Sequence, residues 1–402
     1  MDIFIARQPI FNRNREVYGY ELLFRSGLAN YFDHFDADKA ASQMIGDSAL
    51  FFGIESLTRG KRAFINLTRD SLMKDYPSLL PKDLAVLEVL ETVKPDAEVI
   101  EACRRLKRNG YTLALDDFVY SEAYDPLLKL VDIIKIDFLV TTGADRRSLF
   151  NKFAPQGKMF LAEKVESQEE FQEALDIGYH FFQGFFFSKP VVLSRKEVSG
   201  NKLTTLKVLK ELHHPGLDFS SLDVCISQDL TLSYKLLSYI NSAFFGMNTE
   251  IRSIKHALVL MGESEIRKWA TLVSMASMGE DKPIELTLSS AIRAKMCEMI
   301  ATDIGRKNIS DYFLMGLFSV IDAILDRNLV EVLQDLPLAR EIKTALLRVG
   351  NNPYRQVFEV VLAYEHANWR ALGKWVTKLG IDEMRISDIY MEAVDWAHNS
   401  QS

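Results

Sequence analysis

Cysteine is scarce in this chain, and its scarcity limits the class of protein. The 402 residues include 3 cysteines, Cys103, Cys225 and Cys297, which are far apart. An odd number of cysteines at wide spacing indicates neither a disulfide framework nor a thiolate zinc site. The first residues, Met1–Phe4, lack the basic stretch and the apolar core of a signal peptide. We therefore expect a cytoplasmic protein.

Long apolar runs and excess positive charge are also missing. The longest apolar run, around Phe313 to Ile321, is far shorter than the roughly 20 residues that span a bilayer, so we expect no membrane insertion. The formal net charge is −7, which argues against bulk binding to DNA or RNA. A small anionic nucleotide remains compatible with this charge, because bound metal ions can supply positive charge.

In the first 190 residues, short strand-like runs alternate with longer helical patterns. The expected strands are Ile3–Ile5, Val17–Leu23, Ala63–Asn66, Ala85–Glu88, Thr112–Asp116, Ile133–Ile136, Met159–Glu163 and His180–Gln183. Repeated strand–helix units indicate parallel pairing, and about eight strands favour closure into a TIM-like (βα)8 barrel. An open doubly wound sheet is the alternative, but its usual glycine-rich first turn is absent. The first two strands are too close for an intervening helix, so we expect the barrel to begin irregularly.

The second half of the chain shows almost no strand signal. Residues 193–202 are rich in Ser, Gly and charges and predict a linker between a barrel of residues 1–192 and an all-helical domain of residues 203–402. The expected helices are Leu203–Leu212, Leu230–Ile240, Ile254–Leu260, Glu263–Met275, Ala291–Ile304, Leu314–Leu325 and Gln356–Tyr364. The overall prediction is an α/β barrel followed by an all-α domain.

Polar or charged residues occur where most of the predicted strands end. They are Glu21, Asn66, Glu88, Asp116, Asp117, Lys135, Asp137, Glu163 and Gln183. The C-terminal ends of barrel strands meet at one rim, so we expect these side chains to lie together. Strands that simply end at solvent would explain one or two such residues, but not a set of carboxylates with single Asn, Lys and Gln residues.

The residue types at this rim suit hydrolysis of a phosphodiester. Oxygen-rich ligand sets favour hard cations, and we expect two Mg²⁺ or Mn²⁺ ions. Two such ions can activate a water molecule and stabilise the leaving oxygen. A nearby lysine can hold the water or the phosphate, and a further glutamate can accept the proton.

The ordered motifs resemble the EAL family of cyclic di-GMP phosphodiesterases, which fold as modified strand–helix barrels. The matching motifs are Glu21–Arg25, Asn66–Thr68, Glu88–Glu91, Asp116–Phe118, Lys135–Asp137, Glu163–Glu166 and Gln183–Phe185. The resemblance covers roughly residues 1–192. It implies that the protein opens cyclic di-GMP to linear pGpG.

The resemblance also implies a role for each rim residue. The metal ligands would be Glu21, Asn66, Glu88, Asp116 and Asp117. Lys135 would position the water or the phosphate, and Glu163 would act as the base or orient it. Arg25 would contact a substrate phosphate, and the substrate-binding Gln183 would support the site together with Glu91, Asp137 and Glu166.

Three departures from the family pattern leave the catalytic status open. Leu22 replaces the alanine of the Glu-Ala-Leu motif, and Lys164 replaces a usual glycine beside the expected base. The loop after Asp117 has Val119 and Tyr120 in place of a glycine-containing turn, and such residues tolerate positive φ poorly. The alternatives to an enzyme are therefore a cyclic di-GMP receptor without turnover and a protein-interaction scaffold.

The helical half is similar to the HDOD domain, an output module related to HD-type metal hydrolases. The resemblance covers about residues 200–400 and is strongest over residues 226–262. The sequence contains no His-Asp dipeptide, and its 7 histidines show no metal-ligand spacing, so we expect a non-catalytic domain. By resemblance it would contact an unidentified protein partner. Homodimer formation stays open, because the usual dimer-contact loop is among the altered parts.

Overall fold

The computed structural model describes residues 3–26, 54–189, 236, 239–240, 254–336 and 338–401. The predicted linker 193–202 and the predicted helices over 203–212 and most of 230–240 lie outside the described residues. The chain divides into two compact units. One contains residues 1–189 and 362–374, and the other contains residues 190–361 and 375–402.

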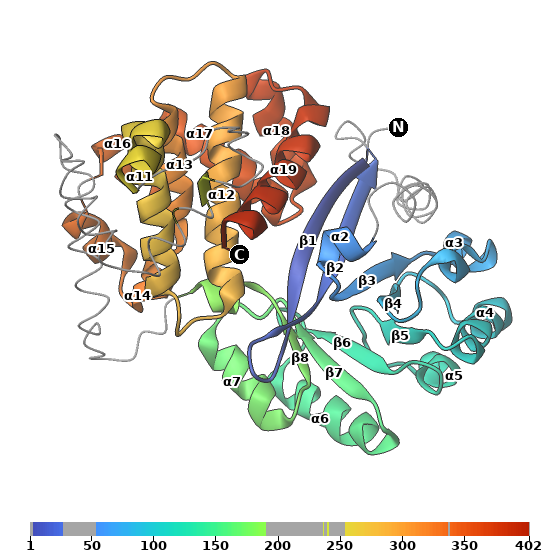
Figure 1. The fold of residues 1–402 in the computed structure, drawn as a ribbon. Coiled ribbons are helices and arrows are strands. Elements are labelled where there is room, and N and C mark those ends of the chain that lie inside the picture. Colours follow the sequence, from blue (N-terminus) through green and yellow to red (C-terminus); the bar gives the residue numbers. More distant parts are fainter. Residues whose placement is uncertain are drawn as a thin grey trace. The chain divides into compact units, whose positions relative to one another are not determined.

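The first unit is built on a closed barrel of eight strands, which confirms the predicted fold class (Figure 1). The strands are β1 (Ile3–Asn12), β2 (Val17–Ser26), β3 (Arg62–Leu67), β4 (Ala85–Val89), β5 (Thr112–Leu115), β6 (Ile133–Asp137), β7 (Met159–Glu163) and β8 (Phe181–Gln183). Strands β2 to β8 pair in parallel, whereas β1 is antiparallel to both β2 and β8. The expected irregular start is therefore an antiparallel first strand.

A tight turn between β1 and β2 explains this irregular start. The Asn12 side-chain oxygen accepts hydrogen bonds from the backbone N–H groups of Asn14 and Glu16, at 2.9 and 3.0 Å. Arg15 takes a φ of 62°, which closes the turn. So short a connection can only join antiparallel neighbours. As a result β1 extends to Asn12, well beyond the predicted end at Ile5.

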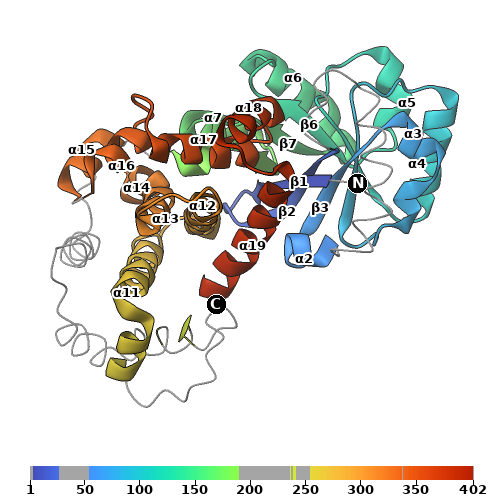
Figure 2. The ribbon, with the colours of Figure 1, turned by 90° about the horizontal axis from the view of Figure 1, so that it is seen from above.

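Helices cover the outside of the barrel (Figures 1 and 2). They are α2 (Ile54–Thr58), α3 (Arg69–Met73), α4 (Ala97–Arg108), α5 (Asp125–Leu128), α6 (Gly143–Phe153) and α7 (Gln168–Ile177), with 3₁₀ turns η1 (Tyr76–Leu79), η2 (Glu122–Tyr124), η3 (Ala154–Gln156) and η4 (Phe185–Ser188). Local sequence sets their ends. For example, α7 begins with a reciprocal capping box between Ser167 and Glu170 and ends at Gly178 in the left-handed conformation.

The barrel interior is arranged in layers. An apolar core cluster contains Ile10, Phe64, Val86, Ala114, Ile133, Leu161 and Phe181. Side chains alternate between the two faces of a strand, so the residue two positions further along points into the same interior. For the parallel strands β3 to β8 those residues are Asn66, Glu88, Asp116, Lys135, Glu163 and Gln183. A polar layer therefore lies directly on the core, at the C-terminal end of these strands.

Residues 362–374 pack as part of the unit that contains the barrel. The buried Tyr364 donates a hydrogen bond from its hydroxyl to the carbonyl oxygen of Ile5, at 2.9 Å. The Trp369 ring lies 6.0 Å from that of Phe4. Burying aromatic rings of this size contributes much of the packing energy at such a contact.

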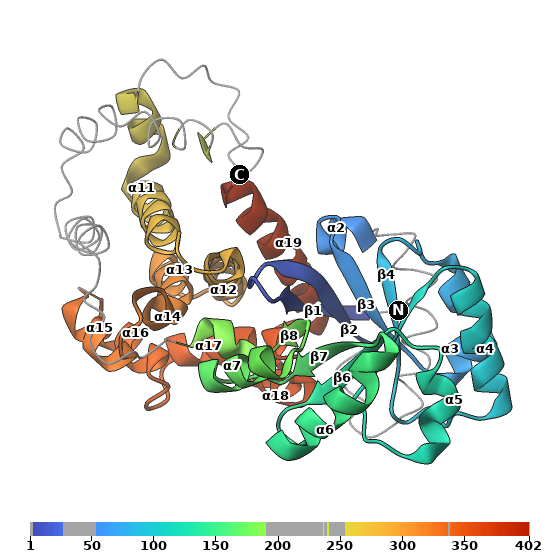
Figure 3. The same cartoon turned by 90° about the horizontal axis from the view of Figure 1, so that it is seen from below.

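The described residues of the second unit are helical. From residue 254 onward the helices are α11 (Ile254–Met278), α12 (Ile284–Asp303), α13 (Ile309–Leu317), α14 (Ile321–Leu325), α15 (Leu329–Asp335), α16 (Arg340–Leu346), α17 (Pro353–Glu365), α18 (Trp369–Leu379) and α19 (Glu383–Gln401), with the 3₁₀ turn η5 (Phe318–Val320). Helix α12 lies between α13 and α19 and packs against both (Figure 3). The predicted break between residues 260 and 263 is found at Gly262, whose backbone is not helical. Within the described residues, no helix combines the length and apolarity needed to cross a membrane.

Gly184 offers a test of how tightly the ends of β7 and β8 are packed. It has a φ of 142°, and a Cβ atom there would lie 2.2 Å from the carbonyl oxygen of Val165. We expect Gly184→Ala to lower the free energy of unfolding of the barrel by about 3 kcal/mol or more, through steric overlap and backbone strain. Gly157→Ala is the matched control, because Gly157 also has positive φ (78°) but has open space around it. Its expected cost is about 1 kcal/mol, and equal losses in urea titrations of the two variants would contradict the packing argument.

Candidate active site

Lys135 lies at the centre of the polar layer and is 0% exposed. Its ammonium nitrogen Nζ lies 2.6 Å from Asp116 Oδ1, 2.8 Å from Glu88 Oε1, 2.8 Å from Glu163 Oε1 and 3.8 Å from Glu21 Oε2. These side chains come from five different strands or strand ends. The structure therefore brings together five residues that the sequence placed at the rim.

The charges in this cluster do not balance. One ammonium group faces four carboxylates, which leaves an excess of negative charge in a region with little water. Burial raises the pKa of Glu88, and nearby Glu21 and Asp116 raise it further against the attraction of Lys135. Burial likewise raises the pKa of Glu163, to about 8. The four carboxylates, acting against burial, raise the pKa of Lys135, so its ammonium stays charged.

Several oxygens in the cluster have no hydrogen-bond partner among the described residues. They are Asn66 Oδ1, both carboxylate oxygens of Glu88, Asp116 Oδ1 and Glu163 Oε2. Lys135 attracts three of these carboxylates by charge, but the geometry gives it no well-directed hydrogen bond to them. Buried oxygens with excess negative charge and unused lone pairs are the donor set that Mg²⁺ and Mn²⁺ prefer. The residues therefore fit the predicted hard cations.

Amide side chains orient Glu21. Asn66 donates from Nδ2 to Glu21 Oε1 at 3.1 Å, and Gln183 donates from Nε2 to Glu21 Oε2 at 2.5 Å. Gln183 also donates to Gln8 Oε1 at 3.2 Å. With both oxygens of its carboxylate used, Glu21 is held toward Lys135 in one orientation.

A second acidic group lies beside the first. Single carboxylate oxygens of Glu91, Asp116 and Asp117 lie within 4.8 Å of one another, and Glu91 is exposed while the other two are half-buried. Asp117 has a φ of 40°, a conformation that turns the chain sharply after Asp116. Asp116 is therefore common to the buried cluster and to this second group.

Lys164 occupies the neighbourhood of this second group. Its Nζ lies 2.5 Å from Asp137 Oδ2 and 3.3 Å from Asp117 Oδ1. Asp137 is held in place, because its Oδ1 accepts a hydrogen bond from the backbone N–H of Leu139. The hydrogen bond to Asp137 and the charge of Asp117 raise the pKa of Lys164 although partial burial opposes this, so its ammonium is positively charged. The Lys164 ammonium group therefore contacts Asp117, which is one of the predicted metal ligands.

The loop after Asp117 follows a path that avoids positive φ at Val119 and Tyr120. The positive φ falls on Asp117 instead, which is among the residue types that tolerate it. Tyr120 packs against Phe153, with ring centroids 5.7 Å apart, and the Lys152 ammonium lies 3.4 Å from the Tyr120 ring centroid. Aromatic packing therefore replaces glycine flexibility in this loop.

The predicted site residues Arg25 and Glu166 lie outside both acidic groups. Arg25 is half-buried on β2, opposite Phe4 in the sheet register. Glu166 is exposed, and its Oε2 lies 3.4 Å from Lys189 Nζ. Both lie near the same end of the barrel as the cluster, but among the described residues the ion pairs of Lys135 are with Glu21, Glu88, Asp116 and Glu163.

Sequence reasoning missed Gln8. The predicted first strand ended at Ile5, whereas Gln8 lies on the longer β1 and receives a hydrogen bond from Gln183. Because β1 is antiparallel to its neighbours, its polar-layer residue lies two positions before the core residue Ile10 rather than after it. The sequence feature that marks Gln8 is therefore a polar residue two positions before, rather than after, a core residue.

Comparisons with known proteins address both halves of the chain. The EAL domain model matches residues 30–190, and the HDOD domain model matches residues 203–343. The cyclic di-GMP phosphodiesterase CdgJ of Vibrio cholerae is 36% identical over 98% of this chain and 92% of its own length. The chain belongs to the EAL–HDOD family. The uncharacterized protein YuxH of Bacillus subtilis, another relative of this EAL–HDOD protein, is 38% identical over 99% of both chains.

Solved structures with EAL domains resemble the first unit. A standalone EAL protein from Vibrio cholerae with bound cyclic di-GMP is 25% identical over 47% of this chain and 92% of that chain, with a TM-score of 0.35. Klebsiella pneumoniae BlrP1, solved with manganese and cyclic di-GMP, is 24% identical over 46% of this chain and 55% of that chain, with a TM-score of 0.38. Glu21 and Arg25 of the EAL–HDOD protein precede the range that the EAL family model matches.

The raised pKa of Glu163 predicts a pH-dependent gain in stability for Glu163→Gln. The folded-state pKa of about 8 exceeds the unfolded value of about 4.3, so the folded state favours the protonated carboxyl. The wild type therefore loses stability as the pH rises from about 4.3 to 8, and the uncharged glutamine does not. In EDTA we expect nearly equal thermal midpoints at pH 4.5 and a gain of up to about 4 kcal/mol for the variant at pH 8.

Glu101→Gln is the control for this comparison, because Glu101 is an exposed glutamate on α4. Its thermal midpoint should not rise at pH 8. A Glu163→Gln protein that is less stable than the wild type at pH 8 would contradict the charge imbalance described for the cluster.

Proposed function

We propose that the EAL domain of this protein hydrolyses cyclic di-GMP to linear pGpG with the help of two divalent metal ions. The observation that carries the proposal is the buried cluster of four carboxylates around Lys135, with oxygens left unpartnered among the described residues. A merely structural site would not need so many uncompensated buried charges. Similarity to the phosphodiesterase CdgJ over nearly the whole chain supports it.

The proposed ligands of the two Mg²⁺ or Mn²⁺ ions are Glu21, Asn66, Glu88, Asp116 and Asp117. When bound, the ions would supply positive charge for the phosphate and lower the pKa of a water molecule. Asn66 and Gln183 hold the Glu21 carboxylate in orientation. Exposed Glu91 extends the donor set beside Asp116 and Asp117.

In the proposed mechanism Lys135 holds the attacking water or a phosphate oxygen. Glu163 accepts the proton of that water, since its carboxylate lies 2.8 Å from Lys135 Nζ and therefore beside the group that holds the water. The water oxygen bonds to phosphorus, the bond from phosphorus to one ribose oxygen breaks, and the proton finally resides on that leaving oxygen. Arg25 contacts a substrate phosphate, while Asp137 and Glu166 support the rim from its edge.

A receptor without turnover is the second candidate, and the position of Lys164 favours it. The Lys164 ammonium already contacts Asp117 and Asp137, where it competes with a cation for the same carboxylate. A site with one occupied ligand could retain the nucleotide and cleave it slowly or not at all.

We further propose that the HDOD domain transmits the state of the EAL domain to a protein partner. The sequence contains no His-Asp pair of the HD hydrolase type. This supports an output role rather than a second catalytic centre.

Product analysis tests the proposed activity. Purified protein is incubated with cyclic di-GMP and Mg²⁺ or Mn²⁺, and pGpG is quantified by chromatography. We expect Glu21→Ala to lower kcat/KM by at least about a hundredfold, because both amide side chains lose the carboxylate they orient. Glu101→Ala, on the outer surface of α4, should retain wild-type activity. Cyclic di-GMP binding without pGpG would favour the receptor, and absence of binding would leave the scaffold.

Removal of the Lys164 ammonium should tighten metal binding. The variants Lys164→Gly and Lys164→Gln both remove the positive charge beside Asp117, and only glycine also relieves the φ of 54°. We expect both to bind Mn²⁺ about tenfold more tightly in calorimetric titrations without nucleotide, which corresponds to roughly 1.4 kcal/mol. Affinities equal to that of the wild type would show that Lys164 does not compete for the site.

A further inference from the structure

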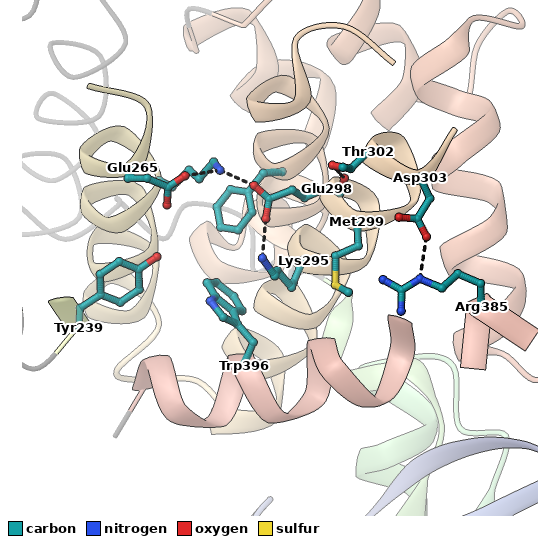
Figure 4. Close-up of a pocket in the computed structure, with 11 residues that line it drawn as sticks. Tyr239, Glu265, Lys295, Glu298, Met299, Thr302, Asp303, Arg385 and Trp396 are labelled. Atoms are coloured by element: carbon teal, nitrogen blue, oxygen red, sulfur yellow. Dashed lines mark hydrogen bonds and ion pairs between the residues drawn. The ribbon is translucent and has the colours of Figure 1, made fainter. Parts of the chain in front are cut away.

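The second unit contains a cavity of about 260 Å³ that the proposed phosphodiesterase activity does not use (Figure 4). Side chains from α11, α12, α13 and α19 line it, together with Tyr239. This volume is many times the roughly 10–15 Å³ that a cavity needs to hold a single water molecule. It therefore has room for a small metabolite, but not for a dinucleotide.

Buried charges form the floor of the cavity. Lys268 donates to Glu265 Oε1 at 2.6 Å and also to Glu298, while Lys295 donates to the other Glu298 oxygen at 2.9 Å. Lys268 and Lys295 are each 8% exposed, and Glu298 is 9% exposed. Although burial opposes ionisation of Glu298, the two lysines lower its pKa, so the network consists of true ions. Figure 4 shows the Lys295 side chain directed at Glu298.

The stability of a helical unit does not require a network of buried ions such as the one around Glu298. Desolvating ions costs free energy that their mutual attraction often does not recover, and apolar side chains of similar volume would usually stabilise a helical core as well or better. Here the ions also line a cavity. Convergent buried ions at a cavity are typical of ligand sites.

Aromatic rings form the walls beside these ions. The Lys295 ammonium lies 5.5 Å from the Trp396 ring centroid, and the Lys268 ammonium lies 5.6 Å from that of Phe313. The Phe313 and Trp396 rings meet edge to face at 5.7 Å. The cavity therefore offers an apolar group of a bound molecule an aromatic surface that lies beside charges of both signs.

The outer end of the cavity carries a further ion pair. Arg385 donates from Nε to Asp303 Oδ2 at 2.8 Å, and both Asp303 and Thr302 are exposed. The lining thus includes three cationic and three anionic side chains. The ions of the lining are already paired with one another, so a ligand with a single net charge would add one unmatched charge. A ligand that carries one charge of each sign keeps the balance and can share the existing partners.

We propose that this cavity binds a small zwitterion of the α-amino acid class with an aromatic or large aliphatic side chain. Its carboxylate would face Lys295 and Arg385, its ammonium group would face Glu265 and Glu298, and its side chain would lie against Trp396. A ligand of this kind offers a partner to each sign of charge and fills the apolar wall.

Calorimetric titration of the full chain tests the proposal, with L-phenylalanine, L-tryptophan and L-leucine as ligands. For a ligand of this size we expect a Kd between about 10 μM and 1 mM. L-Phenylalaninamide lacks the carboxylate and 3-phenylpropanoate lacks the ammonium group, and each should bind at least tenfold more weakly than phenylalanine. Guanosine monophosphate is titrated as well, as a control ligand that is an anion and not a zwitterion.

Two variants locate the binding site. Lys295→Met removes one buried ion. Thr302→Trp blocks the exposed end of the cavity and removes the hydrogen bond from the Thr302 hydroxyl to the Glu298 backbone carbonyl, but it leaves the ion pairs between the charged side chains in place. Both should weaken amino acid binding at least tenfold, while Lys307→Met, at an exposed lysine between α12 and α13, should leave it unchanged. Circular dichroism checks folding, and Thr302→Trp decides the outcome if Lys295→Met does not fold. Absence of amino acid binding, binding that Thr302→Trp leaves unchanged, or binding of the anion alone would overturn the proposal.

Discussion

The constraint on which the first unit depends is the burial of Lys135 among four carboxylates. No arrangement of these five side chains is neutral when all are ionised, and none of them can reach bulk water easily. The single ammonium group reduces the electrostatic repulsion between the four carboxylates. The negative charge that remains favours the binding of cations. Because Lys135 makes undirected ion pairs, its contacts can be exchanged for metal–oxygen contacts without breaking a rigid hydrogen-bond network. The same feature therefore underlies both the packing of the rim and the proposed binding of divalent ions.

Much of the fold and of the rim could be predicted from the sequence, because both follow from strand periodicity. Buried parallel strands read as short apolar runs, and a charged residue within such a run is conspicuous, as Lys135 is between Ile134 and Ile136. The number of runs favoured a closed barrel, and closure brings all strand ends to one rim. The convergence of Glu88, Asp116 and Glu163 on Lys135 was expected on this basis, although their chemical roles remain proposals.

The features that the sequence did not reveal depend on contacts between segments that are far apart in the chain. The length and direction of β1 are set by its pairing with β2 and β8, so the position of Gln8 two residues before Ile10 becomes informative only once that pairing is known. The contact of Lys164 with Asp117 requires two loops whose unusual backbone conformations are fixed by tertiary packing. The buried ions around Glu298 likewise come from separate helices, and each lysine or glutamate alone reads as an ordinary solvent-exposed residue of a helix.

The two-residue spacing between the core layer and the polar layer restricts how this protein can diverge. A one-residue insertion or deletion inside a strand would turn Glu88 or Lys135 outward and move an apolar neighbour into the rim. Such a change would damage the core and the site together. The strands therefore cannot gain or lose residues without affecting both. Change in chain length is tolerable only in the connections beyond the strands, such as the segment after Asp117. We therefore expect relatives to keep their strand lengths nearly constant while their rim loops diversify, and catalytic rate to be tuned in evolution through the loops rather than the barrel.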